Sequence, residues 1–159
     1  SLTEQILSQH DKIYGAGELS ELGKLVETVV RKNKDVTTSI SDIRSGYFSH
    51  LINLSQKHSH FVDKMPTNFK YIPLIVRIFP EAKIIHLKRD ARAVCWSNYC
   101  QDFSSPSMQY SNELKKIVEY FNLYYDKMSK YEEEYGDRIL HLNYEDLTNE
   151  PESHIRCLL

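Results

Sequence analysis

One stretch, residues 83–97, constrains the fold of this chain more than any other part of the sequence. It contains a short, mostly apolar run with β-branched side chains at residues 84–87, which is typical of a buried strand. Asp90 follows this run and can cap a helix over residues 91–99, because its carboxylate can accept hydrogen bonds from the free N–H groups of the first helical turn. A strand, a loop and a helix in this order predict one βα unit of a parallel sheet.

Cationic side chains stand where that strand is expected to end. Lys88 and Arg89 would lie with the N–H groups of the following helix at the carboxyl edge of the sheet, where an anion binds well. Ser97 lies two helical turns beyond Arg89, so the two could hold one phosphate only if the loop folds back over the helix. The local pattern alone favours an ordinary βα unit with a solvated Lys-Arg corner, and an anion site is the alternative.

The rest of the chain alternates helices with short strands. We expect strands at residues 61–64, 84–88 and 139–143, and helices at residues 2–10, 19–31, 43–58, 69–79, 91–99, 112–135 and 152–159. Asn68 can cap the helix over residues 69–79, and the segment 11–18, with two glycines, is expected to be a turn-rich connection. These elements predict an α/β domain in which helices wrap a short parallel sheet, with residues 84–88 as its central strand.

Composition places the chain among soluble globular proteins. It has 159 residues, of which 41% are hydrophobic and 26% charged, enough for one domain with a hydrophobic core. A net charge of −2 gives no reason to expect a nucleic-acid partner. The three cysteines are odd in number and lack metal-ligand spacing, which argues against a disulfide framework and against a zinc site. No apolar run is long enough to span a membrane, so no membrane contact is expected within this chain.

Two segments carry a resemblance to a known family. They are Asp63-Lys-Met-Pro-Thr-Asn68 and the run from Phe79 to Val94, which contains the central strand and Arg89. Through them the chain resembles the sulfotransferase family, in particular its tyrosylprotein-sulfotransferase-like and bacterial branches, from residue 1 to about residue 151. The resemblance implies a P-loop-like, three-layer α/β domain. It also implies transfer of a sulfuryl group from 3′-phosphoadenosine 5′-phosphosulfate (PAPS), the co-substrate, to a hydroxyl of a protein tyrosine or a small molecule, without a metal.

The resemblance assigns cofactor contacts to four residues of this sequence. Arg89 and Ser97 match the family's two ligands of the 3′-phosphate. Ser1 matches the far end of the loop that surrounds the 5′-phosphosulfate. Tyr144 opens a Tyr-Glu-Asp-Leu signature, where it can hydrogen-bond or stack near the nucleotide. A corner tyrosine that only packs is an equally good interpretation of Tyr144.

Two further residues match the family's catalytic groups. Glu18 matches the general base that takes a proton from the acceptor hydroxyl. Lys64 matches a lysine that stabilises charge on the bridging oxygen between phosphate and sulfate. The alternatives without a catalytic role are a first-turn acid at a helix N-terminus for Glu18 and an exposed loop lysine for Lys64.

The resemblance also implies what the chain lacks. Only the end of the 5′-phosphosulfate loop is present at residue 1, and the later loop over the adenine is absent. We therefore expect one sulfotransferase domain over residues 1–159, truncated at both ends, whose isolated chain is inactive. A non-catalytic binding module or pseudoenzyme is the rival function. A P-loop kinase is disfavoured, because no Gly-x-x-x-x-Gly-Lys-Ser/Thr stretch is present. The acceptor and the oligomeric state are left open, a homodimer being compatible, and a bacterial source would favour the cytoplasm.

Overall fold

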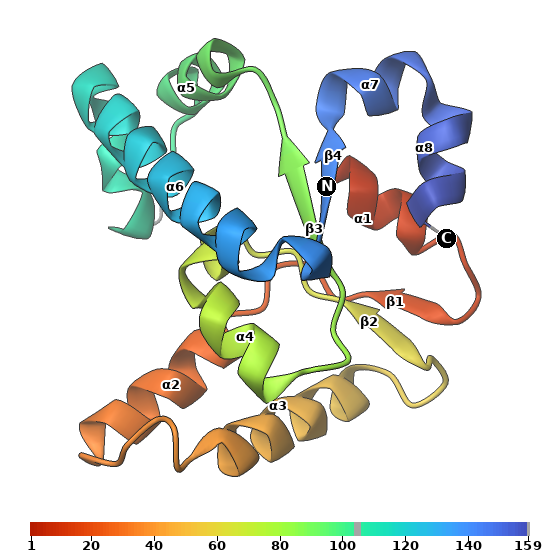
Figure 1. The fold of residues 1–159 in the computed structure, drawn as a ribbon, viewed down its shortest axis with the longest axis vertical. Helices are drawn as coiled ribbons and strands as arrows, with labels where there is room; N and C mark the ends of the chain where they lie inside the picture. Colours follow the sequence, from red (N-terminus) through yellow and green to blue (C-terminus); the bar gives the residue numbers. More distant parts are fainter. Residues whose placement is uncertain (104–105, 159) are drawn as a thin grey trace. The chain divides into compact units, whose positions relative to one another are not determined.

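The computed structural model describes residues 1–103 and 106–158, which form two compact units (Figure 1). Residues 1–82 make up most of the first unit, and residues 83–157 make up the second. Each unit combines helices with a pair of short parallel strands. The predicted α/β class with parallel strands is therefore confirmed. Within the described ranges, no helix is both long and apolar enough to cross a membrane.

The first unit contains one two-stranded sheet and the helices around it. Its elements are α1 (Leu2–Leu7), β1 (Ile13–Gly15), α2 (Glu21–Arg31), α3 (Ile40–Leu54), β2 (His60–Val62), the 3₁₀ helix η1 (Pro66–Tyr71) and α4 (Ile72–Ile78). Strands β1 and β2 are parallel, with Ile13 opposite His60 and Gly15 opposite Val62. The Ala16 N–H extends the pairing by donating to the Val62 carbonyl at 2.9 Å.

Strand β1 corrects the expectation of a turn-rich connection over residues 11–18. A run as short as Ile-Tyr-Gly carries no readable alternation, and its two nearby glycines are typical of turns. It becomes a strand because β2, far along the chain, supplies its hydrogen-bond partners. The strand therefore depends on a long-range pairing that local pattern does not reveal.

The core of the first unit lies among α2, α3 and α4, which lie together in Figure 1. Its buried side chains are Leu22, Val29, Ile43, Tyr47, Leu51, Ile78 and Phe79. Gly46 allows the close approach of α3 to α2, since a Cβ at this position would lie 3.0 Å from the Leu25 Cδ2 atom. The burial of these apolar faces holds the helices beside the short sheet.

The helix expected over residues 69–79 is divided into η1 and α4. Pro73 lies in the first turn of α4 and has no N–H with which to continue a helix that began at residue 69. Asn68 does not cap a helix here: it lies inside η1, and its side chain is hydrogen-bonded to Asp63.

The second unit contains the central stretch of the sequence. Its elements are β3 (Ile84–Lys88), α5 (Ala91–Cys100), the 3₁₀ helix η2 (Pro106–Asn112), α6 (Leu114–Tyr135), the 3₁₀ helix η3 (Gly136–Arg138), β4 (Ile139–Asn143), α7 (Tyr144–Asn149) and α8 (Pro151–Leu158). Strands β3 and β4 are parallel and in register from Ile84 opposite Ile139 to Lys88 opposite Asn143. Both strands have the predicted bounds.

The arrangement of strands differs from the prediction of one sheet with residues 84–88 at its centre. The described strands form two separate two-stranded sheets, β1 with β2 and β3 with β4. Each strand has only three to five residues, and hydrophobic pattern identifies strands of this length without specifying their partners.

Two histidines face each other across the β3–β4 pair. The Nδ1 atoms of His86 and His141 are 3.0 Å apart, and α6 adds Tyr124, whose hydroxyl contacts His86 Nε2, and Glu132, whose carboxylate contacts His141. Burial, together with the charges of His141 and Lys88, lowers the pKa of His86 to about 4. Burial and Lys88 also lower the pKa of His141, while Glu132 opposes them.

The histidine pair predicts that the protein loses stability as the pH falls from 7 to 5. Because the pKa of His86 is lower in the folded chain than the ordinary value of 6.5, the unfolded chain binds more protons across this range. Allowing for partial exposure, we expect the free energy of unfolding to fall by about 1–2 kcal/mol through His86. Urea unfolding at both pH values measures the change. It should be smaller in His86→Gln, and an equal pH dependence in both proteins would contradict the account.

Candidate functional site

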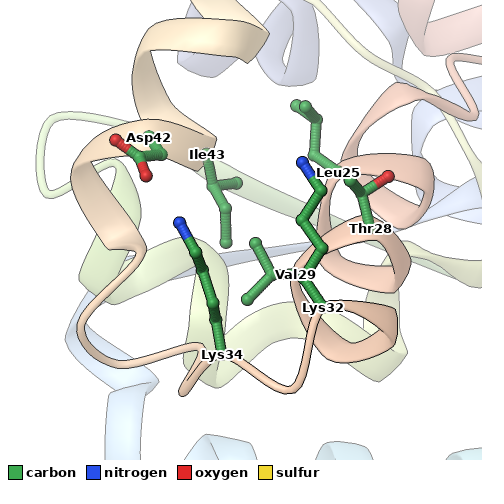
Figure 2. Close-up of a pocket in the computed structure, with 7 residues that line it drawn as sticks. All are labelled: Leu25, Thr28, Val29, Lys32, Lys34, Asp42 and Ile43. Atoms are coloured by element: carbon green, nitrogen blue, oxygen red, sulfur yellow. The ribbon is translucent and has the colours of Figure 1, made fainter.

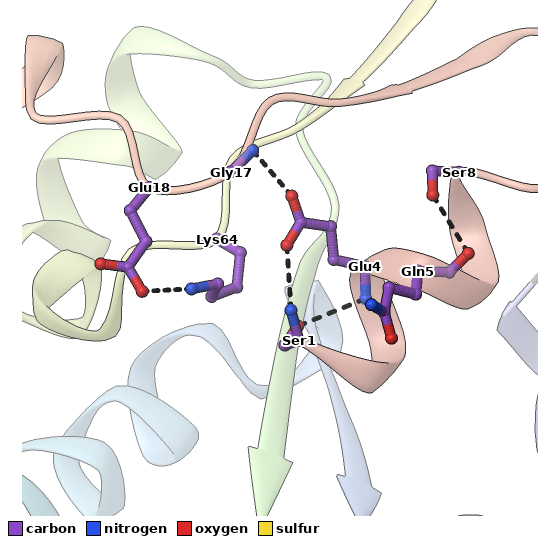
Figure 3. A network of polar contacts seen from close by, with 7 residues as sticks. All are labelled: Ser1, Glu4, Gln5, Ser8, Gly17, Glu18 and Lys64. Atoms are coloured by element: carbon purple, nitrogen blue, oxygen red, sulfur yellow. Dashed lines mark hydrogen bonds and ion pairs between the residues drawn. The ribbon is translucent and has the colours of Figure 1, made fainter.

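Glu18 and Lys64 meet beyond the carboxyl ends of β1 and β2. Parallel strands present these ends at the same edge of a sheet, where ligand sites of α/β proteins commonly form. Glu18 follows β1 by three residues and Lys64 follows β2 by two. The Lys64 ammonium makes an ion pair with a Glu18 carboxylate oxygen, although 46 positions separate them in the sequence (Figure 3). The structure thus brings together the two residues that the resemblance assigned to catalysis.

The backbone of Gly17, just before Glu18, is held by hydrogen bonds at both its N–H and its carbonyl. Gly17 has a φ of +70°, a left-handed conformation that glycine adopts without steric cost. Its carbonyl accepts from the Lys64 N–H at 2.8 Å, and its own N–H donates to Glu4 Oε1 at 2.7 Å. The turn at Gly17 therefore links the loop that carries Glu18 to the one that carries Lys64.

Asp63 forms a second link between these two loops. One oxygen of its carboxylate accepts from the Leu19 N–H at 3.4 Å, and the other accepts from the Tyr47 hydroxyl at 2.7 Å. Burial raises the pKa of Asp63, even though its hydrogen bonds act in the opposite direction. The pKa of Tyr47 is also raised, by burial and by the adjacent Asp63 charge. Sequence reasoning missed both residues, although the position of Asp63 just before Lys64 was a usable signal.

Ser1 caps α1 in this structure. Its hydroxyl accepts from the Glu4 N–H at 3.3 Å, and the amino group of Ser1 lies 3.1 Å from Glu4 Oε2 (Figure 3). Burial acts to raise the pKa of Glu4, whereas the hydrogen bond from the Gly17 N–H and the charge of Lys64 act to lower it. Glu4 is therefore a charged support for the Gly17 turn.

In the second unit, Arg89 and Tyr144 follow the paired strands directly. Arg89 comes after β3 and Tyr144 comes after β4, and the Arg89 guanidinium carbon lies 4.9 Å from the centre of the Tyr144 ring. The Asp90 N–H donates to Glu145 Oε1 at 3.0 Å and joins the same two strand ends. The guanidinium thus lies over the face of an aromatic ring, and this cation–π contact stabilises its positive charge.

Asp90 begins α5 as the sequence predicted. Its carboxylate accepts from the Ala93 N–H at 3.0 Å. This hydrogen bond, followed by the contact with Arg92, lowers the pKa of Asp90. The cap fixes where α5 starts relative to Arg89.

Ser97 lies on the exposed side of α5, at the seventh position of that helix. At a rise of 1.5 Å per residue it is displaced by about 9 Å along the helix axis from Ala91. No hydrogen bond joins Arg89 to Ser97 within residues 1–103 and 106–158, and their common role at a phosphate stays a prediction.

Other parts of the described chain do not add to this site. A pocket of about 130 Å³ between α2 and α3 is lined by both apolar and charged side chains, among them two lysines (Figure 2). It is lined by Leu25, Thr28, Val29, Lys32, Lys34, Asp42 and Ile43, none of which is a predicted site residue. Among the residues that the structure describes, no group of three or more His, Cys, Asp or Glu side chains is arranged to hold a metal ion.

Parallel strands with charged side chains at their carboxyl ends, one of them followed directly by a capped helix, place the chain in the α/β class. The sequence model of the sulfotransferase family matches residues 1–159, and the chain belongs to this family.

A relative in Aquifex aeolicus (strain VF5), described as an uncharacterized protein, is 35% identical to the chain over 176 aligned residues. The alignment covers 100% of this chain and 23% of the relative. The chain thus spans about a quarter of the length of that curated relative.

Proposed function

We propose that this chain provides the sulfotransferase domain of an enzyme that moves a sulfuryl group from PAPS to a hydroxyl acceptor. The observation that carries the proposal is the ion pair between Glu18 and Lys64 beyond β1 and β2. The carboxylate of Glu18 and the ammonium group of Lys64, in contact beyond the carboxyl ends of two parallel strands, supply the two charges that this reaction needs. The family match to residues 1–159 supports the reaction class.

The chemistry assigns one role to each member of the pair. The acceptor oxygen forms a bond to sulfur while the bond between sulfur and the bridging oxygen of PAPS breaks. Glu18 takes the proton of the acceptor hydroxyl, and Lys64 stabilises the negative charge that develops on the bridging oxygen. The products are a sulfate ester and adenosine 3′,5′-bisphosphate, so no metal or redox partner is required.

The ion pair also suggests how binding of the donor could rearrange the two groups. Glu18 and Lys64 each neutralise the other at a partly exposed strand edge. When the bridging oxygen of PAPS replaces Glu18 as the partner of Lys64, the carboxylate becomes available to the acceptor hydroxyl. Binding of the donor would thereby prepare the base.

Arg89 and Ser97 are proposed as the ligands of the 3′-phosphate of PAPS. The support is the position of Arg89 directly after β3 and beside a capped helix, with the Tyr144 ring beneath its guanidinium. Contact with Ser97 requires the Arg89 side chain to reach back along α5. Tyr144 would hold the guanidinium in place, and Ser1 would contribute at the 5′-phosphosulfate.

Replacing Arg89 by alanine should weaken binding of adenosine 3′,5′-bisphosphate by about 1.5–3 kcal/mol, the scale of charge-assisted hydrogen bonds. Calorimetry on the natural full-length protein measures the affinity. Arg92→Ala is the matched control, because Arg92 lies in the first turn of α5 with an almost fully exposed side chain. Equal affinities of the wild type and Arg89→Ala would rule out the assigned role.

The function itself is tested by following radiolabelled sulfur from PAPS into a panel of acceptors, including a tyrosine peptide and small phenols. Labelled sulfate ester in at least one acceptor, with release of adenosine 3′,5′-bisphosphate, is the expected result. Tight nucleotide binding without transfer to any acceptor would instead support the non-catalytic binding module.

A further inference from the structure

Gly17 and Leu19, the sequence neighbours of Glu18, are hydrogen-bonded to Lys64 and Asp63, which are neighbours of each other. Gly17 precedes Glu18, and its carbonyl accepts from the Lys64 N–H at 2.8 Å. Leu19 follows Glu18, and its N–H donates to Asp63 Oδ1 at 3.4 Å. Glu18 and Lys64 are therefore held opposite each other by a pair of bonds that flank the ion pair.

Of these two bonds, only the one to Asp63 depends on a side chain. Any residue at position 64 except proline could donate its N–H to Gly17, whereas the Leu19 N–H needs a side-chain acceptor at position 63. The carboxylate of Asp63 fills this need and is itself anchored by Tyr47, whose hydroxyl donates to Oδ2 at 2.7 Å.

Tyr47 connects this carboxylate to the core of the first unit. Its side chain is only 7% exposed, and its ring packs against Phe79 with the ring centres 5.1 Å apart. Movement of Asp63 is thereby restricted by α3 and by the packed core.

Placing a charged carboxylate at position 63 is energetically unfavourable. Asp63 is partly buried close to the negative charge of Glu4, and burial raises its pKa. A buried acid is usually balanced by a partner of opposite charge, but the recorded donors to Asp63 are neutral: the Tyr47 hydroxyl, the Leu19 N–H and the Asn68 side chain. Simple packing does not account for such an arrangement.

We infer that Asp63, anchored by Tyr47, is a positioning residue that holds the loops carrying the base Glu18 and the cation Lys64 opposite each other. The inference rests on the proposed function of Glu18 and Lys64. Asp63 makes no contact with the reacting atoms in this account and acts through the backbone on either side of the pair. Small misplacements of catalytic groups can lower rates by about 10²-fold.

The test compares Asp63→Ala with Asp63→Asn in the natural full-length protein. Asp63→Ala should lower kcat by about 10²-fold and leave the KM for PAPS close to the wild-type value. Asp63→Asn keeps an oxygen that can accept from Leu19 and should recover much of kcat. Asp11→Ala, an exposed acid two residues before β1, is the matched control and should behave as the wild type. Wild-type kcat in Asp63→Ala, or equal losses in both Asp63 variants, would overturn the inference.

Amide hydrogen exchange gives a second measurement that does not depend on activity. Asp63→Ala should speed exchange at Leu19, Gly17 and Lys64, and Tyr47→Phe should do so to a smaller extent. Unchanged exchange at these amides would overturn the inference even if no sulfuryl transfer is found. Absence of transfer by the wild type refutes the proposed function, and in that case the exchange rates alone decide whether Asp63 positions the two loops.

Discussion

Replacing Glu18 by glutamine in the natural full-length protein should lower kcat for sulfuryl transfer by about 10²- to 10⁴-fold, the range that a positioned general base contributes. Glutamine keeps the size of the side chain and one oxygen for Lys64, but it cannot take a proton from the acceptor hydroxyl. The affinity for adenosine 3′,5′-bisphosphate should be retained. Transfer of labelled sulfur from PAPS at saturating donor and acceptor measures the effect.

Glu21→Gln is the matched control for this variant. Glu21 lies three residues beyond Glu18 in the first turn of α2, where it pairs with Lys24. Its loss should leave kcat close to the wild-type value. Similar rates in the wild type and in Glu18→Gln, or similar losses in both variants, would contradict the role of Glu18 as the base.

The second large effect is expected for Lys64→Met. Methionine approximates the length of lysine but brings no charge to the bridging oxygen of PAPS. Removal of one group that stabilises developing negative charge lowers kcat by about 10²- to 10³-fold in well-studied sites. The variant also leaves Glu18 without its ion-pair partner. Transfer of labelled sulfur to the best acceptor, with the donor saturating, measures the loss.

Lys57→Met controls for the removal of a surface charge near β2. Lys57 is exposed in the segment between α3 and β2 and should be replaceable without loss of kcat. Full activity of Lys64→Met would contradict the role of Lys64 as the leaving-group cation and would leave the ion pair as a structural contact only.

The parts of the fold that could be predicted are those with a strong local signal. Strand β3 and the start of α5 follow from an apolar run and from the cap at Asp90, and the structure confirms both. The register between β3 and β4 could not be read, because it depends on the pairing of segments 55 positions apart, as in the partners His86 and His141.

Strand β1 shows why other parts could not be predicted. Its three residues have the appearance of a turn, and only pairing with β2 gives them a strand conformation. The division of residues 66–78 into η1 and α4 has a local cause in Pro73. It was not predicted, because the apolar residues continue at helical spacing across this proline.

The candidate site was predicted in part. A family resemblance, and not residue spacing, selected Glu18 and Lys64, and the structure places them in contact. Their supports, Glu4 and Asp63, were missed because each acts through a backbone N–H at a distant position in the sequence. The contact between Arg89 and Tyr144 was also missed, since it depends on the parallel pairing of β3 with β4.

The central claim is that Glu18 takes the proton from the hydroxyl acceptor during sulfuryl transfer from PAPS. The most direct test is the dependence of kcat on the pKa of the acceptor in a series of substituted phenols. In the wild type, kcat should vary little across the series, because the enzyme removes the proton. In Glu18→Gln, kcat should fall steeply as the phenol becomes less acidic, and the most acidic phenols should recover much of the lost rate. Parallel plots for the two proteins, or absence of transfer from PAPS to every phenol by the wild type, would contradict the account.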